Sequence, residues 1–200
     1  MEIRCLNMKK RMILVTSPPA SGKTFVSQQL AKRIPNLVYL DKDALIPLSK
    51  QIFIAAGEPI NRSSQFFEEN IRNFEYEAIL DIGFEALRYA DIVLINAPFT
   101  REVKDNEYFK NLRTKLFSYD AELMLIWVET DIEVSHKRML ARNSPRDTWK
   151  LANWDEYVKT RDYSTPDLPS LSGCLVKFFN SNNVEFNESM ERISKYLLEE

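Results

Sequence analysis

Cysteine and histidine are scarce in this chain of 200 residues, and their positions exclude several kinds of chemistry. The two cysteines, Cys5 and Cys174, lie far apart and form no CxxC or metal-ligand pattern. We therefore expect two free thiols in a reducing compartment. The one histidine, His136, stands in a charged stretch, and we interpret it as a helix-surface residue rather than a catalyst or a ligand.

Long apolar runs and an excess of positive charge are also missing. No apolar run approaches the roughly 20 residues that span a bilayer, and the N-terminal stretch lacks the apolar core of a signal peptide. We expect a cytoplasmic protein without a membrane segment. The net charge of -2 favours no polyanionic partner, so nucleic-acid binding is not expected. The length suits one hydrophobic core, and without a repeat or a linker we predict a single domain over residues 1–200.

Short apolar runs alternate with helical patterns along the chain. The runs predict strands at residues 12–16, 37–40, within 91–99, 122–130 and 175–179. Apolar spacing predicts helices at residues 23–34, 65 to about 88, 105–120, 131–143 and 187–200. Residues 46–64 are expected to be loose, and residues 144–170 irregular or briefly helical. The alternation predicts an α/β sandwich whose parallel sheet is covered on both faces.

Residues 17–24 read SPPASGKT, close to the phosphate-binding pattern G-x-x-x-x-G-K-[ST]. In such a loop the backbone N–H groups point at phosphate oxygens, and the next helix presents its positive end. Gly22 allows a close approach, Lys23 reaches the transferring phosphate, and the Thr24 hydroxyl can coordinate Mg²⁺. Ser17 replaces the first glycine of the pattern, but serine can adopt most turn conformations. The residues expected to bind the nucleotide here are Pro19, Ala20, Ser21, Gly22, Lys23, Thr24 and Phe25.

Two aspartates follow the second predicted strand, where the carboxyl ends of parallel strands gather around a ligand. A carboxylate at this place can take the proton of an acceptor hydroxyl as the γ-phosphate arrives. We choose Asp43 as this base and assign Asp41 a structural role. The alternative is that Asp43 only caps the helix that begins near Ala44.

Three arginines follow the fourth predicted strand at intervals of four residues: Arg138, Arg142 and Arg146. In a helix this spacing places them on one face. Arginines directed at the transferring phosphoryl group stabilise its charge. Pro145 interrupts the helix, so the predicted catalytic pair is Arg138 and Arg142. The alternative is a solvated basic face.

Asn96 ends the third predicted strand, at a place where an aspartate commonly helps to hold Mg²⁺. An amide can bind a metal-bound water but brings no charge. This substitution is the main argument for a nucleotide-binding protein that does not catalyse transfer.

Together these residues resemble P-loop kinase-like proteins grouped with chloramphenicol phosphotransferase, zeta toxins and the kinase domain of polynucleotide kinase, including AAA-family ATP-binding members. The resemblance covers the SPPASGKT loop, LDKDAL, INAPF and RMLARNSPRD. It implies a three-layer P-loop NTPase fold with a five-stranded parallel sheet in the order 2-3-1-4-5, and a lid at about 138–165. It also implies ATP and Mg²⁺, Asp43 as the base, and Arg138 and Arg142 as lid arginines. The acceptor surface would come from residues 47–67 and parts of the lid.

The segment FFNSNN ends the last predicted strand near the expected position of the adenine ring. The amide of Asn180 could hydrogen-bond the base, although Asn-rich turns also form for conformational reasons. Trp149 and Trp154 could stack on a base, but we interpret them as a hydrophobic tether for the lid.

The leading hypothesis is an ATP-dependent kinase that phosphorylates a hydroxyl of a small molecule. A second hypothesis changes the acceptor to a nucleic-acid 5′-hydroxyl, against which the acidic composition argues. A third is a nucleotide-binding regulator or slow ATPase without an acceptor, and a fourth is an interaction scaffold with a vestigial site. The sequence leaves the acceptor and the oligomeric state open.

Overall fold

A parallel sheet of five strands forms the centre of the protein, whose computed structural model describes residues 9–144, 147–160 and 162–199. The strands are β1 (Lys10–Thr16), β2 (Val38–Asp41), β3 (Ile92–Asn96), β4 (Ala121–Glu129) and β5 (Leu175–Phe179). Their order across the sheet is β2-β3-β1-β4-β5, and each neighbouring pair is parallel. The predicted α/β fold and strand order are therefore confirmed.

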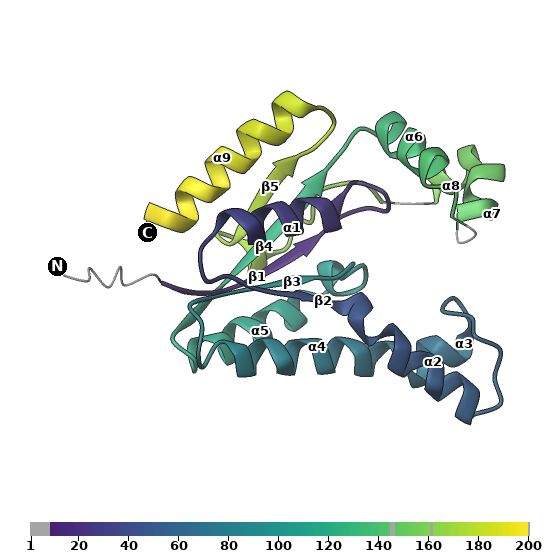
Figure 1. Ribbon diagram of the computed structural model, residues 1–200, viewed down its shortest axis with the longest axis horizontal. Coiled ribbons are helices and arrows are strands. Elements are labelled where there is room, and N and C mark those ends of the chain that lie inside the picture. The colour runs from purple at the N-terminus through teal and green to yellow at the C-terminus, as the bar shows by residue number, and fades with distance from the viewer. Residues whose placement is uncertain (1–8, 145–146, 161, 200) are drawn as a thin grey trace.

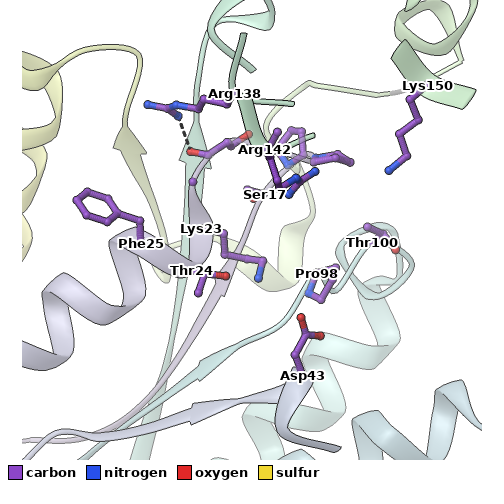
Figure 2. Close-up of a pocket in the computed structure, with 15 residues that line it drawn as sticks. Ser17, Lys23, Thr24, Phe25, Asp43, Pro98, Thr100, Arg138, Arg142 and Lys150 are labelled. Carbon is purple, nitrogen blue, oxygen red and sulfur yellow. Dashed lines mark hydrogen bonds between the residues drawn. The ribbon is translucent and has the colours of Figure 1, made fainter. Parts of the chain in front are cut away.

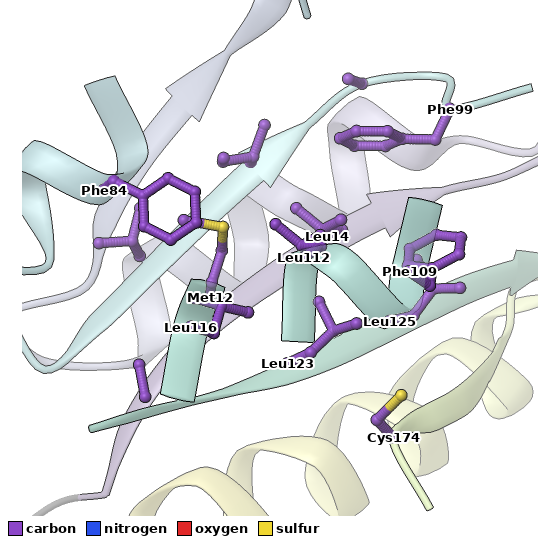
Figure 3. Close-up of a cluster of buried hydrophobic side chains, with 14 of the residues drawn as sticks. Met12, Leu14, Phe84, Phe99, Phe109, Leu112, Leu116, Leu123, Leu125 and Cys174 are labelled. Atoms are coloured by element: carbon purple, nitrogen blue, oxygen red, sulfur yellow. The ribbon is translucent and has the colours of Figure 1, made fainter. Parts of the chain in front are cut away.

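Helices cover both faces of the sheet, because the side chains of β1 alternate between two cores. Met12 and Leu14 pack with the helices α4 (Arg72–Ala86) and α5 (Asn106–Phe117) (Figure 3). Ile13 and Val15 point to the other face, where α1 (Lys23–Arg33) and α9 (Asn183–Glu199) supply the packing residues. All four side chains are fully buried. Figure 1 shows the resulting three layers.

The carboxyl ends of the strands lie at the end of the molecule opposite the start of β1 and the end of α9 (Figure 1). Two groups of shorter helices flank this end. One group contains α6 (Ile132–Arg142), α7 (Thr148–Ala152) and α8 (Trp154–Lys159), and the other contains α2 (Ile46–Ala55) and α3 (Gln65–Asn70). Short 3-10 helices occur at η1 (Lys42–Leu45), η2 (Glu102–Lys104) and η4 (Pro169–Leu171). Across the described ranges, no helix combines the length and the apolar character that crossing a bilayer requires.

Three predicted segments differ in the structure. Residues 46–64 were expected to be loose, but α2 forms there because Pro47 stands in its first turn, where a missing N–H costs nothing. The single helix predicted from residue 65 is two helices, since the backbone of Ile71 (φ −128°) leaves the helical region. The last helix begins at residue 183 rather than 187.

The predicted cysteine chemistry is tested at one position. Cys174 is a buried free thiol, and burial raises its pKa. Cys5 and Arg146 lie outside the described residues. The predicted short helices after residue 143 are present as α7 and α8.

Candidate active site

The loop between β1 and α1 has the backbone of a phosphate cradle. Ala20 and Gly22 both adopt the left-handed conformation, with φ of 65° and 86°. Ser17 does not, so this position requires no glycine. Ala20 adopts the left-handed conformation instead, which costs an L-residue about 1–2 kcal/mol. The first N–H groups of α1 have no acceptor within the helix and are available to an anion.

The loop is anchored through the carbonyl oxygen of Ser21, which accepts three hydrogen bonds. Its donors are Asn180 Nδ2 at 2.7 Å, Thr130 Oγ1 at 3.0 Å and Arg138 Nη1 at 3.1 Å. Arg138 also donates from Nη2 to the carbonyl oxygen of Asn180 at 2.8 Å. Burial lowers the pKa of Arg138. Arg138 and Asn180, both predicted to contact the nucleotide, are thus held by the loop and its surroundings.

Gly22 is required for a reason that the motif does not reveal. A Cβ atom at this position would lie 2.5 Å from Asn180 Nδ2, and the Asn180 side chain is itself buried. The absence of a side chain therefore lets Asn180 reach across the loop to the Ser21 carbonyl.

Asn96 connects the loop with the end of β2. Its Oδ1 accepts from Lys23 Nζ at 2.6 Å, and its Nδ2 donates to Thr24 Oγ1 at 3.2 Å. The same Nδ2 donates to Asp41 Oδ2 at 2.8 Å. Burial and the neighbouring Asp41 together raise the pKa of Tyr39, which also donates to Asp41. The carboxylate of Asp41 thus lies on the strand next to Asn96, at the position that pairs with it in the sheet.

Asp41 is the aspartate that caps the short helix after β2. Its Oδ1 accepts from the backbone N–H of Asp43 at 2.9 Å, which makes Asp41 the N-cap of η1. The alternative that Asp43 is the cap is therefore wrong. The Asp43 side chain is exposed and faces the cavity beside the loop.

This cavity has a volume of about 420 Å³ and is lined by residues 17–25 of the loop. Asp43 and the turn after β3 line one side, and cationic side chains from α6 and α7 line the other (Figure 2). The cations are Arg138, Arg142 and Lys150. The two arginines are among the residues predicted from the sequence, and Lys150 is not.

Arg142 and Lys150 share one buried partner. Asp147 Oδ2 accepts from Arg142 Nε at 2.9 Å, and Asp147 Oδ1 accepts from Lys150 Nζ at 3.0 Å. Burial by itself raises the pKa of Asp147, but the hydrogen bonds from Lys150 and Arg142 outweigh it and hold that pKa below its ordinary value. Asp147 is therefore ionised at neutral pH.

Two further cavities adjoin the loop. One of about 600 Å³ lies against Gly22, Phe25 and Arg138, and the amide-rich residues 180–183 complete it. Phe25 packs against Phe186 beside it, with 5.3 Å between ring centroids. The other, about 400 Å³, extends from the start of the loop to Trp127 and residues 162–168.

Trp149 and Trp154 have different environments. Trp154 stacks on His136, with ring centroids 4.0 Å apart and an angle of 13° between the planes. This stack joins the start of α8 to α6. Trp149 is 57% exposed. The role of either residue as a tether stays a prediction.

The oxygen atoms at the loop fit Mg²⁺. This ion takes oxygen ligands, keeps several waters, and binds one or two protein groups together with substrate phosphates. The Thr24 hydroxyl and the Asp41 carboxylate, both bonded to Asn96, offer such a set. Over the described part of the chain, no group of three or more His, Cys, Asp or Glu side chains could hold a metal on its own.

The model of a family described as an AAA domain matches residues 12–162. Several solved structures share the fold over 96% of this chain. A candidate kinase from Chloroflexus aurantiacus has 23% identity and a TM-score of 0.57, with 96% of its own chain covered. A gluconokinase from Sinorhizobium meliloti has 17% identity and a TM-score of 0.55, with 97% covered. The APS kinase of Mycobacterium tuberculosis, in complex with AMPPNP and APS, has 17% identity and a TM-score of 0.52, with 99% covered. No curated protein matches the chain.

Proposed function

The chain belongs to the AAA domain family and is a P-loop kinase-like protein, and from this we propose that it transfers the γ-phosphoryl group of ATP to a hydroxyl of a small molecule. The gluconokinase and the APS kinase of the same fold are named for small-molecule substrates. The observation that carries the proposal is the position of Asp43. It faces the same cavity as the phosphate loop, and the cations of the lid lie across from it (Figure 2).

Each group at the cavity has a role in this reaction. The loop amides and Lys23 hold the phosphates of ATP, and Mg²⁺ bound at the Thr24 hydroxyl would neutralise part of their charge. Asp43 orients the acceptor hydroxyl and takes its proton. Arg142 stabilises the charge that develops on the transferring group. Arg138 joins the phosphate cavity to the larger amide-lined cavity, which is where we place the adenine ring.

Two substitutions test this assignment. We expect Lys23→Ala and Asp43→Asn each to abolish the transfer of phosphate to an acceptor. Asp43→Asn should leave the affinity for ATP nearly unchanged, because Asp43 contacts the acceptor rather than the nucleotide. The measurement combines ADP release with mass spectrometry of products from a panel of sugars, polyols, nucleosides and hydroxy acids.

Asp155→Asn serves as the matched control, since Asp155 is an exposed aspartate of α8 outside the cavity. If Asp43→Asn transfers phosphate as fast as the wild type, Asp43 is not the base.

A second candidate function is a nucleotide-binding regulator or slow ATPase without an acceptor. The neutral Asn96 at the end of β3 favours it, because this amide brings no charge to the metal. Calorimetry would distinguish the two candidates. ATP binding without a phosphorylated product from the whole panel would support the regulator.

A further inference from the structure

A single buried carboxylate holds two cations of the lid. Asp147 has no exposed surface, and its two oxygens are divided between partners on different helices. Arg142, the last residue of α6, donates two hydrogen bonds to Oδ2, at 2.9 and 2.5 Å. Lys150 of α7 donates one to Oδ1 at 3.0 Å. An ionised buried carboxylate with charged donors on both oxygens fixes the positions of those donors.

The two cations keep hydrogen-bonding capacity for a ligand. Both side chains line the phosphate cavity, whereas Asp147 lies behind them and does not. Nη1 of Arg142 and two of the three Nζ hydrogens of Lys150 have no hydrogen-bond partner among the described residues, and the Lys150 ammonium lies 5.8 Å from the centroid of the Tyr157 ring. In Figure 2 the amine of Lys150 extends from α7 toward the cavity, on the side opposite Asp43.

Arg138 is arranged differently. Both of its Nη groups donate to backbone carbonyls, those of Ser21 and Asn180. It lines the phosphate cavity and the amide-lined cavity alike, so it lies on the nucleotide-base side of the loop. Of the three cations that α6 and α7 bring to the cavity, Arg142 and Lys150 therefore remain for the Asp43 side.

We propose that Lys150 is a binding residue for the terminal phosphate of ATP, and that Asp147 is a positioning residue that holds Lys150 and Arg142 at the cavity wall. This inference rests on the proposed function and deepens it. Of the described residues that line the cavity, Lys23, Arg138, Arg142 and Lys150 are cationic and Asp43 is the one anionic residue, which suits a polyphosphate. Lys150 acts as a point charge with several donors, a form of phosphate recognition that lysine commonly provides.

The first test compares a nucleoside triphosphate analogue with a diphosphate. In calorimetry with Mg²⁺, we expect Lys150→Met to weaken AMPPNP binding about 10-fold and to leave ADP binding unchanged, because the lost hydrogen bond to a charged group concerns only the terminal phosphate. Lys150→Arg should recover most of the affinity for AMPPNP. Lys159→Met is the matched control, since Lys159 is an exposed lysine of α8 outside the cavity.

The outcomes separate this inference from the proposed function. The role of Lys150 is refuted if Lys150→Met binds AMPPNP as tightly as the wild type, or if its affinities for AMPPNP and ADP fall by the same factor. The kinase proposal stands in either case. If the wild type binds neither nucleotide, both fall.

Asp147→Asn tests the positioning role through the sign of its effect. The substitution removes a negative charge behind the cavity, so attraction alone would strengthen the binding of AMPPNP. A positioning role predicts the opposite: AMPPNP binds more weakly, because the two cations lose their shared charged partner. The ratio of AMPPNP affinity to ADP affinity should then fall about 5-fold. Unchanged or tighter AMPPNP binding overturns this role. Thermal unfolding of the variant checks that the protein remains folded, and the AMPPNP-to-ADP ratio separates misplaced cations from general destabilisation.

Discussion

Replacing Gly22 by alanine should destabilise the protein through two separate effects. The first is the backbone conformation, because φ of 86° lies in the region that costs an L-residue about 1–2 kcal/mol. The second is steric, because the new Cβ would lie 2.5 Å from Asn180 Nδ2. To relieve this contact, Asn180 must give up its hydrogen bond to the Ser21 carbonyl. A buried polar group left without its partner costs about 1–3 kcal/mol.

The two effects together predict a loss of about 2–5 kcal/mol in the free energy of unfolding. Gly57 provides the matched control. It has a similar φ of 70°, and a Cβ atom there would meet nothing within 4 Å. Gly57→Ala should therefore show the backbone effect alone. Alanine restricts the unfolded chain equally in both variants, so this contribution cancels from the difference.

Urea denaturation of the nucleotide-free protein, followed by circular dichroism, measures both values. We expect Gly22→Ala to lose about 1–3 kcal/mol more than Gly57→Ala. In the double variant Gly22→Ala/Asn180→Ala the loss should be smaller than the sum of the two single losses, because the colliding side chain is gone. Equal losses for Gly22→Ala and Gly57→Ala would show that the contact with Asn180 has no energetic consequence, and the reasoning would be refuted.

Two more predictions concern charged groups. Burial raises the pKa of Glu75, but hydrogen bonds from Arg62, Lys42 and a serine outweigh it and lower the pKa to about 2, from 4.5. A carboxyl whose pKa is lowered on folding stabilises the protein above its unfolded pKa. The urea midpoint should therefore fall as the pH drops from 4.5 toward 2, and Glu75→Gln should flatten this part of the profile. Separately, Asp41→Asn should weaken AMPPNP binding in the presence of Mg²⁺ about 10-fold and have little effect without it, and Asp41→Asn/Asn96→Asp should recover part of the loss. Equal weakening with and without Mg²⁺ would contradict a role at the metal.

The parts of the fold that the sequence predicts correctly are those that local patterns determine. Buried strands appear as apolar runs, and the phosphate loop appears as a string between a strand and a helix. The break at Ile71 could not be predicted, because aromatic and aliphatic residues continue the helical period through it. The contacts beside the break are distant in sequence, such as the ion pair of Arg72 with Glu102.

The candidate site shows the same division. Lys23, Thr24 and Asp43 carry their chemistry in local motifs, and the structure places all three at one cavity. Lys150 has no motif. Its signal is the spacing of three residues from Asp147, which also brings charged pairs together on solvent-exposed helix surfaces. In the folded protein Asp147 is buried, and its partners come from both α6 and α7.

The position of Asp43 depends on the two residues that precede it in the chain. Asp41 is bonded to the end of β3, and Lys42 is buried in an ion pair with Glu75 of α4, with Nζ and Oε2 2.7 Å apart. The backbone that leads into Asp43 is thus fixed, while the Asp43 side chain remains exposed at the cavity. The same Glu75 also binds Arg62 from the loop between α2 and α3, where the acceptor surface is expected. One carboxylate therefore links the segment that carries Asp43, the proposed base, to the loop between α2 and α3. Because a shift of about 1 Å in a reacting group can cost about 100-fold in rate, disturbing Glu75 should slow transfer far more than it weakens ATP binding.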